Sequence, residues 1–248
     1  MPEYLDQMYL DYEQSFQEFK QLITTDYEPD EYPPAYAQHQ TFGVEFPGAL
    51  IRKPQYENCR FIETKFISSD GSLSRFHECK FMDCILNNCD LRYCDIFESD
   101  FISDKGKAPI SSCNFSYGNF INANFFDINF DGCSFRQMQI ENTTFKNCIM
   151  QNSSIEQSSI KNCTFENINF KKVGVRYCTF ENVEFEKVTF HILDLAKNYG
   201  LIRQLQKKPR SVRIAYANDL EMSLDDAIAR LRKLIPYYLE TNQLQSIL

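Results

Sequence analysis

Ten cysteines and three histidines are the residues of this 248-residue chain best suited to do chemistry. Cys79, Cys84, Cys89 and Cys94 follow one another with four residues between neighbours. Structural zinc sites use cysteines at separations of about two to four residues, so this run suggests a tetrathiolate site. We expect packed thiols instead, because an apolar residue follows each cysteine by two positions and would keep the four sulfur atoms apart.

The histidines His39, His77 and His191 stand apart from other residues that would make them catalytic. The sequence contains no paired-histidine metal motif, glycine-rich phosphate loop, nucleophile elbow or cluster of paired acids. His77 and His191 each follow an apolar residue directly, so we expect both on the solvent side. The sequence therefore predicts no enzyme activity, no catalytic residue, no cofactor and no metal site.

A period of five residues dominates the middle of the chain. Apolar residues recur at every fifth position from Ile110 to Leu195, 18 times in succession. The same period runs upstream from Phe61 to Phe101, except at Gly71. An α-helix repeats near 3.6 residues and a strand near 2, so neither fits. The period predicts a chain that turns a corner after every five residues.

The residues around each apolar centre support this reading. The position two before the centre holds a small side chain, and all ten cysteines occupy it. The position before the centre is often Asp or Asn, whose side chains bond to backbone groups at corners. Segments such as Cys89-Asp90-Leu91-Arg92-Tyr93 and Ala123-Asn124-Phe125-Phe126-Asp127 show the whole pattern.

This pattern resembles the pentapeptide-repeat family over about residues 57–195. The resemblance implies a mainly β fold: a right-handed quadrilateral β-helix, or pentapeptide-repeat solenoid, with four pentads per turn and about seven coils. We expect three parts: an acidic helix with a Pro/Tyr-rich strap (1–55), the solenoid (56–195) and a helical C-terminal cap (196–248). Two irregular stretches, 67–75 and 102–109, are interpreted as bulges or loops because Gly and Pro interrupt them.

The cysteines are interpreted as small fillers of the coil interior. Counting along the repeat places Cys94, Cys113 and Cys133 in one stack and Cys59 with Cys79 in another. Stacked side chains point the same way, which is poor disulfide geometry, so we expect free thiols and a cytoplasmic protein. No apolar run has the length of a membrane span, and the acidic first helix does not resemble a signal peptide.

A terminal helix is predicted after Ser223, where a Ser-x-x-Asp capping box precedes an apolar stripe. The stripe either seals the end of the solenoid or makes a homodimer or partner contact. Several members of the family dimerise through C-terminal segments, so the resemblance implies a dimer. The residues of the stripe are Leu224, Ile228, Leu231, Ile235 and Tyr238.

Two functions fit such a rod. The first is a non-enzymatic scaffold that binds another protein through its faces or termini. The second follows from the resemblance: some members mimic duplex DNA, bind DNA gyrase or topoisomerase IV, and protect them from quinolones or other poisons. The net charge is −7 for residues 1–55, −5 for 56–195 and +4 for 196–248, so the rod itself is weakly acidic. Direct nucleic-acid binding is not expected. The candidate interaction surface is the acidic cluster of Asp90, Asp95, Glu98 and Asp100.

Overall fold

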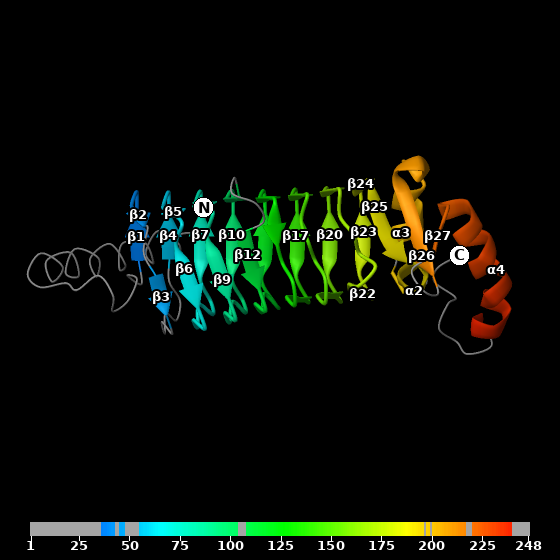
Figure 1. Ribbon diagram of the computed structural model, residues 1–248, viewed down its shortest axis with the longest axis horizontal. Helices are drawn as coiled ribbons and strands as arrows, with labels where there is room; N and C mark the ends of the chain where they lie inside the picture. Colours follow the sequence, from blue (N-terminus) through cyan, green and yellow to red (C-terminus); the bar gives the residue numbers. More distant parts are fainter. Residues whose placement is uncertain are drawn as a thin grey trace, which may run out of the picture.

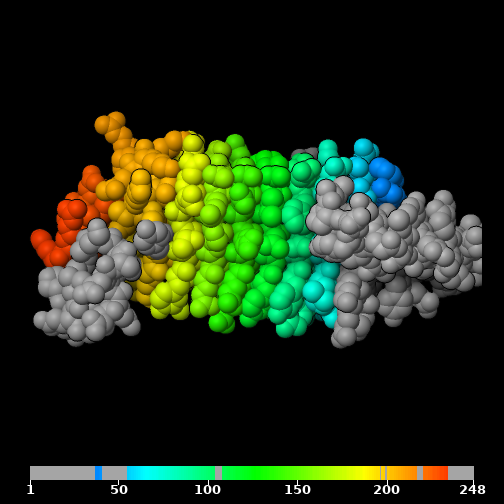
Figure 2. Space-filling view, turned by 180° about the vertical axis from the view of Figure 1, so that it is seen from behind, coloured from blue at the N-terminus to red at the C-terminus, as the bar shows by residue number. Residues whose placement is uncertain are grey.

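The computed structural model describes residues 36–42, 45–47, 55–103, 108–195, 197–198, 200–216 and 220–239. The chain forms a rod of stacked square coils, capped at its C-terminal end by helices (Figure 1). The coils follow the sequence as successive discs in the space-filling view (Figure 2). Two of the four walls contain eight parallel strands each, which gives about eight turns.

The walls are named A to D in the order in which the chain meets them. Wall A is the parallel sheet of β1 (Tyr36–Gln38), β4 (Gln55–Glu57), β7 (Arg75–His77), β10 (Asp95–Phe97), β13 (Asn119–Ile121), β17 (Gln139–Glu141), β20 (Ser159–Lys161) and β23 (Thr179–Glu181). Wall B contains β2 (Thr41–Phe42), β5 (Arg60–Ile62), β8 (Lys80–Met82), β11 (Asp100–Ile102), β14 (Asn124–Phe126), β18 (Thr144–Lys146), β21 (Thr164–Glu166) and β24 (Glu184–Glu186).

Walls C and D contain fewer regular strands. Wall C contains β3 (Glu45–Pro47), β6 (Lys65–Ile67), β9 (Ile85–Asn87), β12 (Ala108–Ser111) and β15 (Ile128–Asn129). Wall D contains β16 (Ser134–Arg136), β19 (Ser154–Glu156) and β22 (Gly174–Arg176). Single bridges extend wall D toward the N-terminus through Asp70, Asp90 and Asn114.

The five-residue period places one apolar centre on each wall of every coil. Phe120, Phe125, Phe130 and Phe135 lie on walls A, B, C and D, each at most 2% exposed, which confirms the square coil. On wall B the rings form an unbroken ladder from Phe61 to Phe185. Neighbouring ring centroids along this ladder are 4.0 to 5.4 Å apart. The core is therefore a continuous column.

Many of the Cys, Ser and Thr residues two before a centre also donate a side-chain hydrogen bond. Cys84 Sγ donates to Phe61 O (3.1 Å), Cys133 Sγ to Ile110 O (2.9 Å) and Ser158 Oγ to Phe135 O (3.0 Å). In each case the acceptor is the carbonyl of an apolar centre in the preceding coil. The position therefore favours Cys, Ser and Thr, which fit a narrow interior and satisfy a buried carbonyl.

The stretch 102–109 is an insertion within one coil. Phe101 lies on wall B and Ile110 on the next wall, C, so the spacing of nine is one wall step plus four residues. Residues 104–107 lie outside the described part. The insertion shifts the register, so Cys113 stacks with Cys89 and Cys133, and the predicted stacking of Cys113 on Cys94 is wrong. Asn119 N donates to Cys94 O, which places Cys94 above Gly118 instead.

The stretch 67–75 contains no bulge or loop, so that prediction is wrong. Gly71 N donates to Asp90 O (2.8 Å) and Leu73 N to Arg92 O (2.9 Å), as the register of wall D requires. Gly71 occupies a centre position without a side chain. The missing group leaves an apolar cavity of about 30 Å³ whose lining includes Leu91 and Phe76.

The described solenoid begins earlier than residue 56. Strands β1, β2 and β3 pair in parallel with β4, β5 and β6, so residues 36–42 and 45–47 form three walls of a further coil in the stretch predicted as a strap. The sequence hides this coil because its centres on walls B and C, Phe42 and Phe46, are four residues apart instead of five. The acidic helix predicted at the start of residues 1–55 lies outside the described residues.

The C-terminal end is capped by a small sheet and helices. Strands β25 (Val188–His191), β26 (Val212–Tyr216) and β27 (Leu220–Met222) form the sheet. Around it lie α2 (Ile192–Leu195), α3 (Leu201–Leu205), the 3₁₀ turn η1 (Pro209–Ser211) and α4 (Leu224–Leu239). No helix within the described ranges has the length and apolar character needed to span a bilayer.

Helix α4 begins at the predicted capping box. Ser223 Oγ donates to Asp226 Oδ2 (2.6 Å) and accepts from Asp226 N (3.2 Å). Leu224 is buried, and Ile228 and Leu231 are partly buried against the core. The side chains of Ile235 and Tyr238 lie outside the described part. The helix continues through Pro236 to Leu239, so it does not end at that proline.

Candidate interaction surface

Every corner of the coil requires a residue in a left-handed backbone conformation. Among the described residues, 24 non-glycine residues have positive φ, and they follow the corners of the coils. Asn, Asp and Gly adopt this conformation most easily, whereas for a bulky residue it is strained. The residue types at the corners therefore show where the chain does not use the residues that suit this conformation best.

The corner between walls D and A departs most. Six of the 24 residues lie there and none is Asn or Asp, whereas 11 of the remaining 18 are. We call this row the tyrosine corner. It consists of Leu73, Tyr93, Tyr117, Gln137, Gln157 and Tyr177.

The first three residues of the tyrosine corner occupy tight turns. Hydrogen bonds close these turns from Ser74 N to Gly71 O, Cys94 N to Leu91 O and Gly118 N to Phe115 O, at 3.2 to 3.3 Å. The third residue of each turn has a φ of 61° to 67°. A type II turn, which has this pattern, favours Gly or Asn at that position. The structure places Leu73, Tyr93 and Tyr117 there.

These three side chains are also exposed. Leu73, Tyr93 and Tyr117 are 45%, 50% and 41% exposed, and the two tyrosine rings stack with their centroids 5.0 Å apart. Tyr177, farther along the same corner, is 68% exposed. The three therefore form a short apolar and aromatic ridge on the surface of the N-terminal half of the described rod.

Ion pairs flank this ridge on both sides. On wall D, Arg92 Nη2 lies 2.6 Å from Asp90 Oδ2, and Arg92 lowers the pKa of this carboxyl group. On wall A, Arg75 Nη2 lies 3.4 Å from Asp95 Oδ2. The ridge is therefore nearly neutral, with arginine and carboxylate groups at its rim.

The structure distributes the four carboxylates of the sequence-predicted surface over three walls. Asp90 and Asp95 lie on walls D and A in the ion pairs just described. Asp100 lies on wall B and accepts a hydrogen bond from Asn124 (2.9 Å). Glu98 lies at the corner between walls A and B and is exposed. The four do not share one wall, although two of them flank the tyrosine corner.

On the described coils, acidic residues gather on wall B with its two corners, in the coils centred on Phe61 to Phe125. Six carboxylates and two cations, Arg60 and Lys80, give a net charge of −4 there. Four coils span about 19 Å, or about one net charge per 5 Å, whereas duplex DNA carries one per about 1.7 Å. The six carboxylates are Glu63, Glu78, Asp83, Glu98, Asp100 and Asp127.

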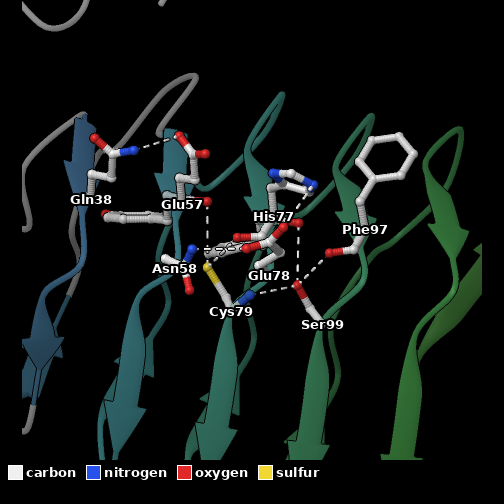
Figure 3. Close-up of polar contacts among 10 residues, drawn as sticks. Gln38, Glu57, Asn58, His77, Glu78, Cys79, Phe97 and Ser99 are labelled. Carbon is white, nitrogen blue, oxygen red and sulfur yellow. Dashed lines mark hydrogen bonds and ion pairs between the residues drawn. The ribbon is translucent and has the colours of Figure 1, made fainter.

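Within the described residues, one group of side chains has atoms close enough to share a cation: His77, Glu78 and Glu98. Figure 3 shows His77 and Glu78 of this group. His77 Nε2 lies 4.0 Å from Glu78 Oε1, and Asn58 donates to Glu78 Oε2 (2.8 Å). A metal-bound histidine usually donates its other ring N–H to a partner. His77 Nδ1 is buried without one, so the group lacks this support. His77 and His191 are half-buried, not fully exposed as expected.

The ten cysteines are buried and free. Cys79, Cys84 and Cys89 donate to the carbonyls of Tyr56, Phe61 and Phe66, one on each of three walls. Burial raises the pKa of the Cys84, Cys163 and Cys178 thiols to about 11, so they are protonated at neutral pH. This arrangement disfavours thiolate chemistry and metal binding.

The sequence reading overlooked the tyrosine corner. It used the centre of each pentad and the two positions before it, whereas the ridge occupies the position two after the centre. A usable signal was present, since Asn is frequent at that position elsewhere in the chain and absent from this corner. The row can be recognised only when each pentad has been assigned to a wall. The insertion within residues 102–109 made that assignment ambiguous.

The comparison with known protein families agrees with this architecture. The family model "Pentapeptide repeats" matches residues 110–147 with eight copies. No curated protein matches the sequence. Similar solved structures include a trypsin-treated form of QnrB1, a plasmid-mediated fluoroquinolone resistance protein. It is 15% identical, covers 68% of this chain and 78% of its own, and has a TM-score of 0.36.

A second similar structure is HetL, a pentapeptide repeat protein involved in heterocyst differentiation regulation from the cyanobacterium Nostoc sp. strain PCC 7120. It is 12% identical, covers 70% of this chain and 81% of its own, and has a TM-score of 0.22. The matched repeats, together with the pentads that occupy four walls between residues 55 and 195, identify a pentapeptide-repeat β-helix in this part of the chain.

Proposed function

We propose that this protein is a non-enzymatic scaffold that binds another protein through the ridge of Leu73, Tyr93 and Tyr117. The observation that supports the proposal is the combination of strain and exposure at these three residues. An exposed apolar side chain gains nothing from burial in the free protein, and a left-handed bulky residue costs about 1–2 kcal/mol. A protein partner that covers the ridge would bury these apolar side chains and so provide the favourable free energy that the free protein does not gain.

The chemistry of the ridge suits a protein surface. Tyrosine and arginine are enriched at the energetically dominant positions of protein interfaces, and Arg92 lies directly beside Tyr93. The stacked rings of Tyr93 and Tyr117 present a rigid aromatic surface with little side-chain entropy to lose. Each hydroxyl group adds a polar handle that a partner could bind. The ridge therefore fits a partner with an apolar groove and polar edges.

Comparative affinity capture tests the proposal. The bait is the wild-type chain or a triple variant, Leu73→Asn, Tyr93→Asn and Tyr117→Asn, in which Asn suits each left-handed turn. The control variant carries Gln137→Asn and Gln157→Asn, on the same corner but outside the ridge. We expect one partner to be captured by wild type and control and lost about tenfold or more by the triple variant. Equal capture by all three baits would refute the ridge as the anchor.

Topoisomerase protection is the second candidate. The net charge of −4 on wall B and its corners supports it, although the density is below that of duplex DNA. A gyrase supercoiling assay separates the two candidates, with and without a quinolone. Inhibition or protection at micromolar protein that survives the triple Asn variant would favour the DNA-mimic role. No effect would leave the protein-binding ridge as the better account.

The proposal includes a cytoplasmic location and a homodimer formed through α4. The ten free thiols support the first, because disulfides are rare in the cytosol. The second rests on the apolar stripe of α4, of which Leu224, Ile228 and Leu231 contact the core of the same chain. Sedimentation at increasing protein concentration tests the dimer, and a constant monomer mass would remove it.

A further inference from the structure

A cluster of cations projects from the C-terminal end of the rod. Residues 203–213 run from α3 through η1 into β26 and contain five basic and no acidic side chains. All five are exposed. Figure 1 shows this part, in orange, standing above the outline of the coils. We call these residues the basic knob: Arg203, Lys207, Lys208, Arg210 and Arg213.

Among the described residues, most of the basic knob has no counter-charge. Lys208 Nζ lies 3.1 Å from Glu184 Oε2 and 3.8 Å from Glu186 Oε2. The other four cations form no ion pair with any residue that the structure describes. Along the coils, by contrast, lysines pair with acids one turn away, as Lys146 does with Glu166 (3.0 Å). The knob is therefore a positively charged surface without its partner.

The complementary negative charge is concentrated in one segment of the same chain. Residues 1–35 contain nine acidic residues and one lysine, a net charge of −8. The whole chain also has a net charge of −8, so residues 36–248 are neutral overall, with 25 acids and 25 bases. The segment carries apolar residues at helical spacing, including Leu5, Tyr9 and Phe16.

We propose that the basic knob binds the acidic segment, residues 1–35, of this same chain. Eight coils at about 4.8 Å place the knob about 38 Å from the first coil. An extended segment of 35 residues spans up to about 115 Å, so it reaches the knob of its own molecule or of a second copy. Exposed Leu193 and Leu220 lie in the same C-terminal cap and offer apolar contacts for the segment. This inference is independent of the tyrosine corner.

Zero-length cross-linking of the full chain tests it. A carbodiimide joins carboxylates to amines that are already in contact, and peptide mass spectrometry locates the links. At low salt we expect links from Lys207 or Lys208 to acids within residues 1–31. Lys171 Nζ lies 2.6 Å from Glu221 Oε1 and provides an internal control link. Raising the salt to about 0.5 M shortens the screening length severalfold, so the expected links should fall about tenfold.

Two variants make the test specific. Arg203→Glu, Arg210→Glu and Arg213→Glu together reverse the knob but keep both reporter lysines, and we expect about a tenfold loss of the N-terminal links. Arg136→Glu, Arg176→Glu and Lys161→Glu change the net charge equally on the coils and should leave these links unchanged. The Lys171–Glu221 link should persist in both variants, which shows that the cap is folded.

Three results would overturn the proposal. The first is the absence of N-terminal links in the wild type while the Lys171–Glu221 link forms. The second is an equal loss of links in both charge-reversal variants. The third is binding of a 20-base-pair duplex by the knob in a chain without N-terminal links, which would assign the knob to a nucleic acid. Links within monomers or between two copies both support it and identify the copy involved.

Discussion

At the scale of single residues, the corners of this rod balance backbone strain against surface chemistry. Most corners carry Asn, Asp or another polar residue, and these form ladders such as Asn142 to Asn122 (3.0 Å) and Asn182 to Asn162 (2.9 Å). At the tyrosine corner, bulky Leu and Tyr side chains occupy four left-handed positions that Asn or Asp would suit better. Residues that reduce the stability of the free protein are expected where function requires them.

Substitution by alanine should change the stability of the protein in opposite directions at two glycines. A Cβ at Gly71 would lie 2.9 Å from Leu91 Cδ2, the end of a flexible side chain beside a cavity of about 30 Å³. A Cβ at Gly118 would lie 2.4 Å from the backbone oxygen of Cys94, which cannot easily move. We expect Gly71→Ala to stabilise by about 0.5–1 kcal/mol and Gly118→Ala to destabilise by about 2 kcal/mol or more. Urea unfolding of both variants measures the two effects, and the same sign for both would be inconsistent with this geometry.

Asp194 should make stability depend on pH. Burial raises the pKa of this carboxyl group from 3.8 to about 7, although His191 N–H and the charges of Lys197 and Arg176 oppose the rise. The folded protein then holds the proton more tightly than the unfolded chain. The contribution to stability is complete below about pH 4 and is lost as the pH rises through 7.

The variant Asp194→Asn isolates this effect, because the amide oxygen can still accept the hydrogen bond from His191 N. We expect the unfolding free energy of the wild type to fall relative to the variant between pH 4 and 7. The difference should be on the order of 4 kcal/mol, from the shift of about three pKa units. Chemical denaturation of both proteins across this range measures it. Parallel curves would show that Asp194 is not buried as an ionisable group.

At the scale of elements, the phenylalanine ladder of wall B is the main stabilising column. Phe125 is 1% exposed and stacks with Phe101 and Phe145 at 5.0 Å on each side. Phe125→Ala should therefore cost about 3–5 kcal/mol, whereas Met82→Ala, at an exposed site on the same wall, should cost less than about 0.5 kcal/mol. Unfolding free energies of the two variants provide the test. Similar costs for both would exclude a core role for the ladder.

The elements that could be predicted from the sequence are those fixed by the period. Centres such as Phe120 and Phe135, the inward thiols and the Ser223 capping box all depend on local patterns that repeat or have defined spacing. The walls after residues 102–109 could not be assigned from the sequence. The spacing of nine between the centres Phe101 and Ile110 fits either two pentads less one residue or one pentad with four extra residues. The first coil was missed for the same reason, at the irregular spacing between Phe42 and Phe46.

At the scale of the whole molecule, the surface of the rod consists of long rows of side chains. Neighbours in a row come from successive coils and not from neighbouring positions in the sequence. The acidic residues Asp90, Asp95, Glu98 and Asp100 are close in sequence but lie on different walls, because one coil distributes 20 residues over four sides. Leu73, Tyr93 and Tyr117 are 20 and 24 residues apart but adjacent in space. The candidate surface therefore needed the coil register, which no local pattern provides.

The proposed role of the ridge implies that it is maintained at the expense of stability. The unfolding free energy of the Leu73→Asn, Tyr93→Asn and Tyr117→Asn triple variant relative to wild type, from urea titration, measures this cost. Relief of strain should contribute about 1 kcal/mol per turn, and loss of the Tyr93–Tyr117 stack should remove about 1 kcal/mol. We therefore expect the variant to be more stable by about 2 kcal/mol. A less stable variant would contradict the account, because it would show that the three side chains support the fold itself.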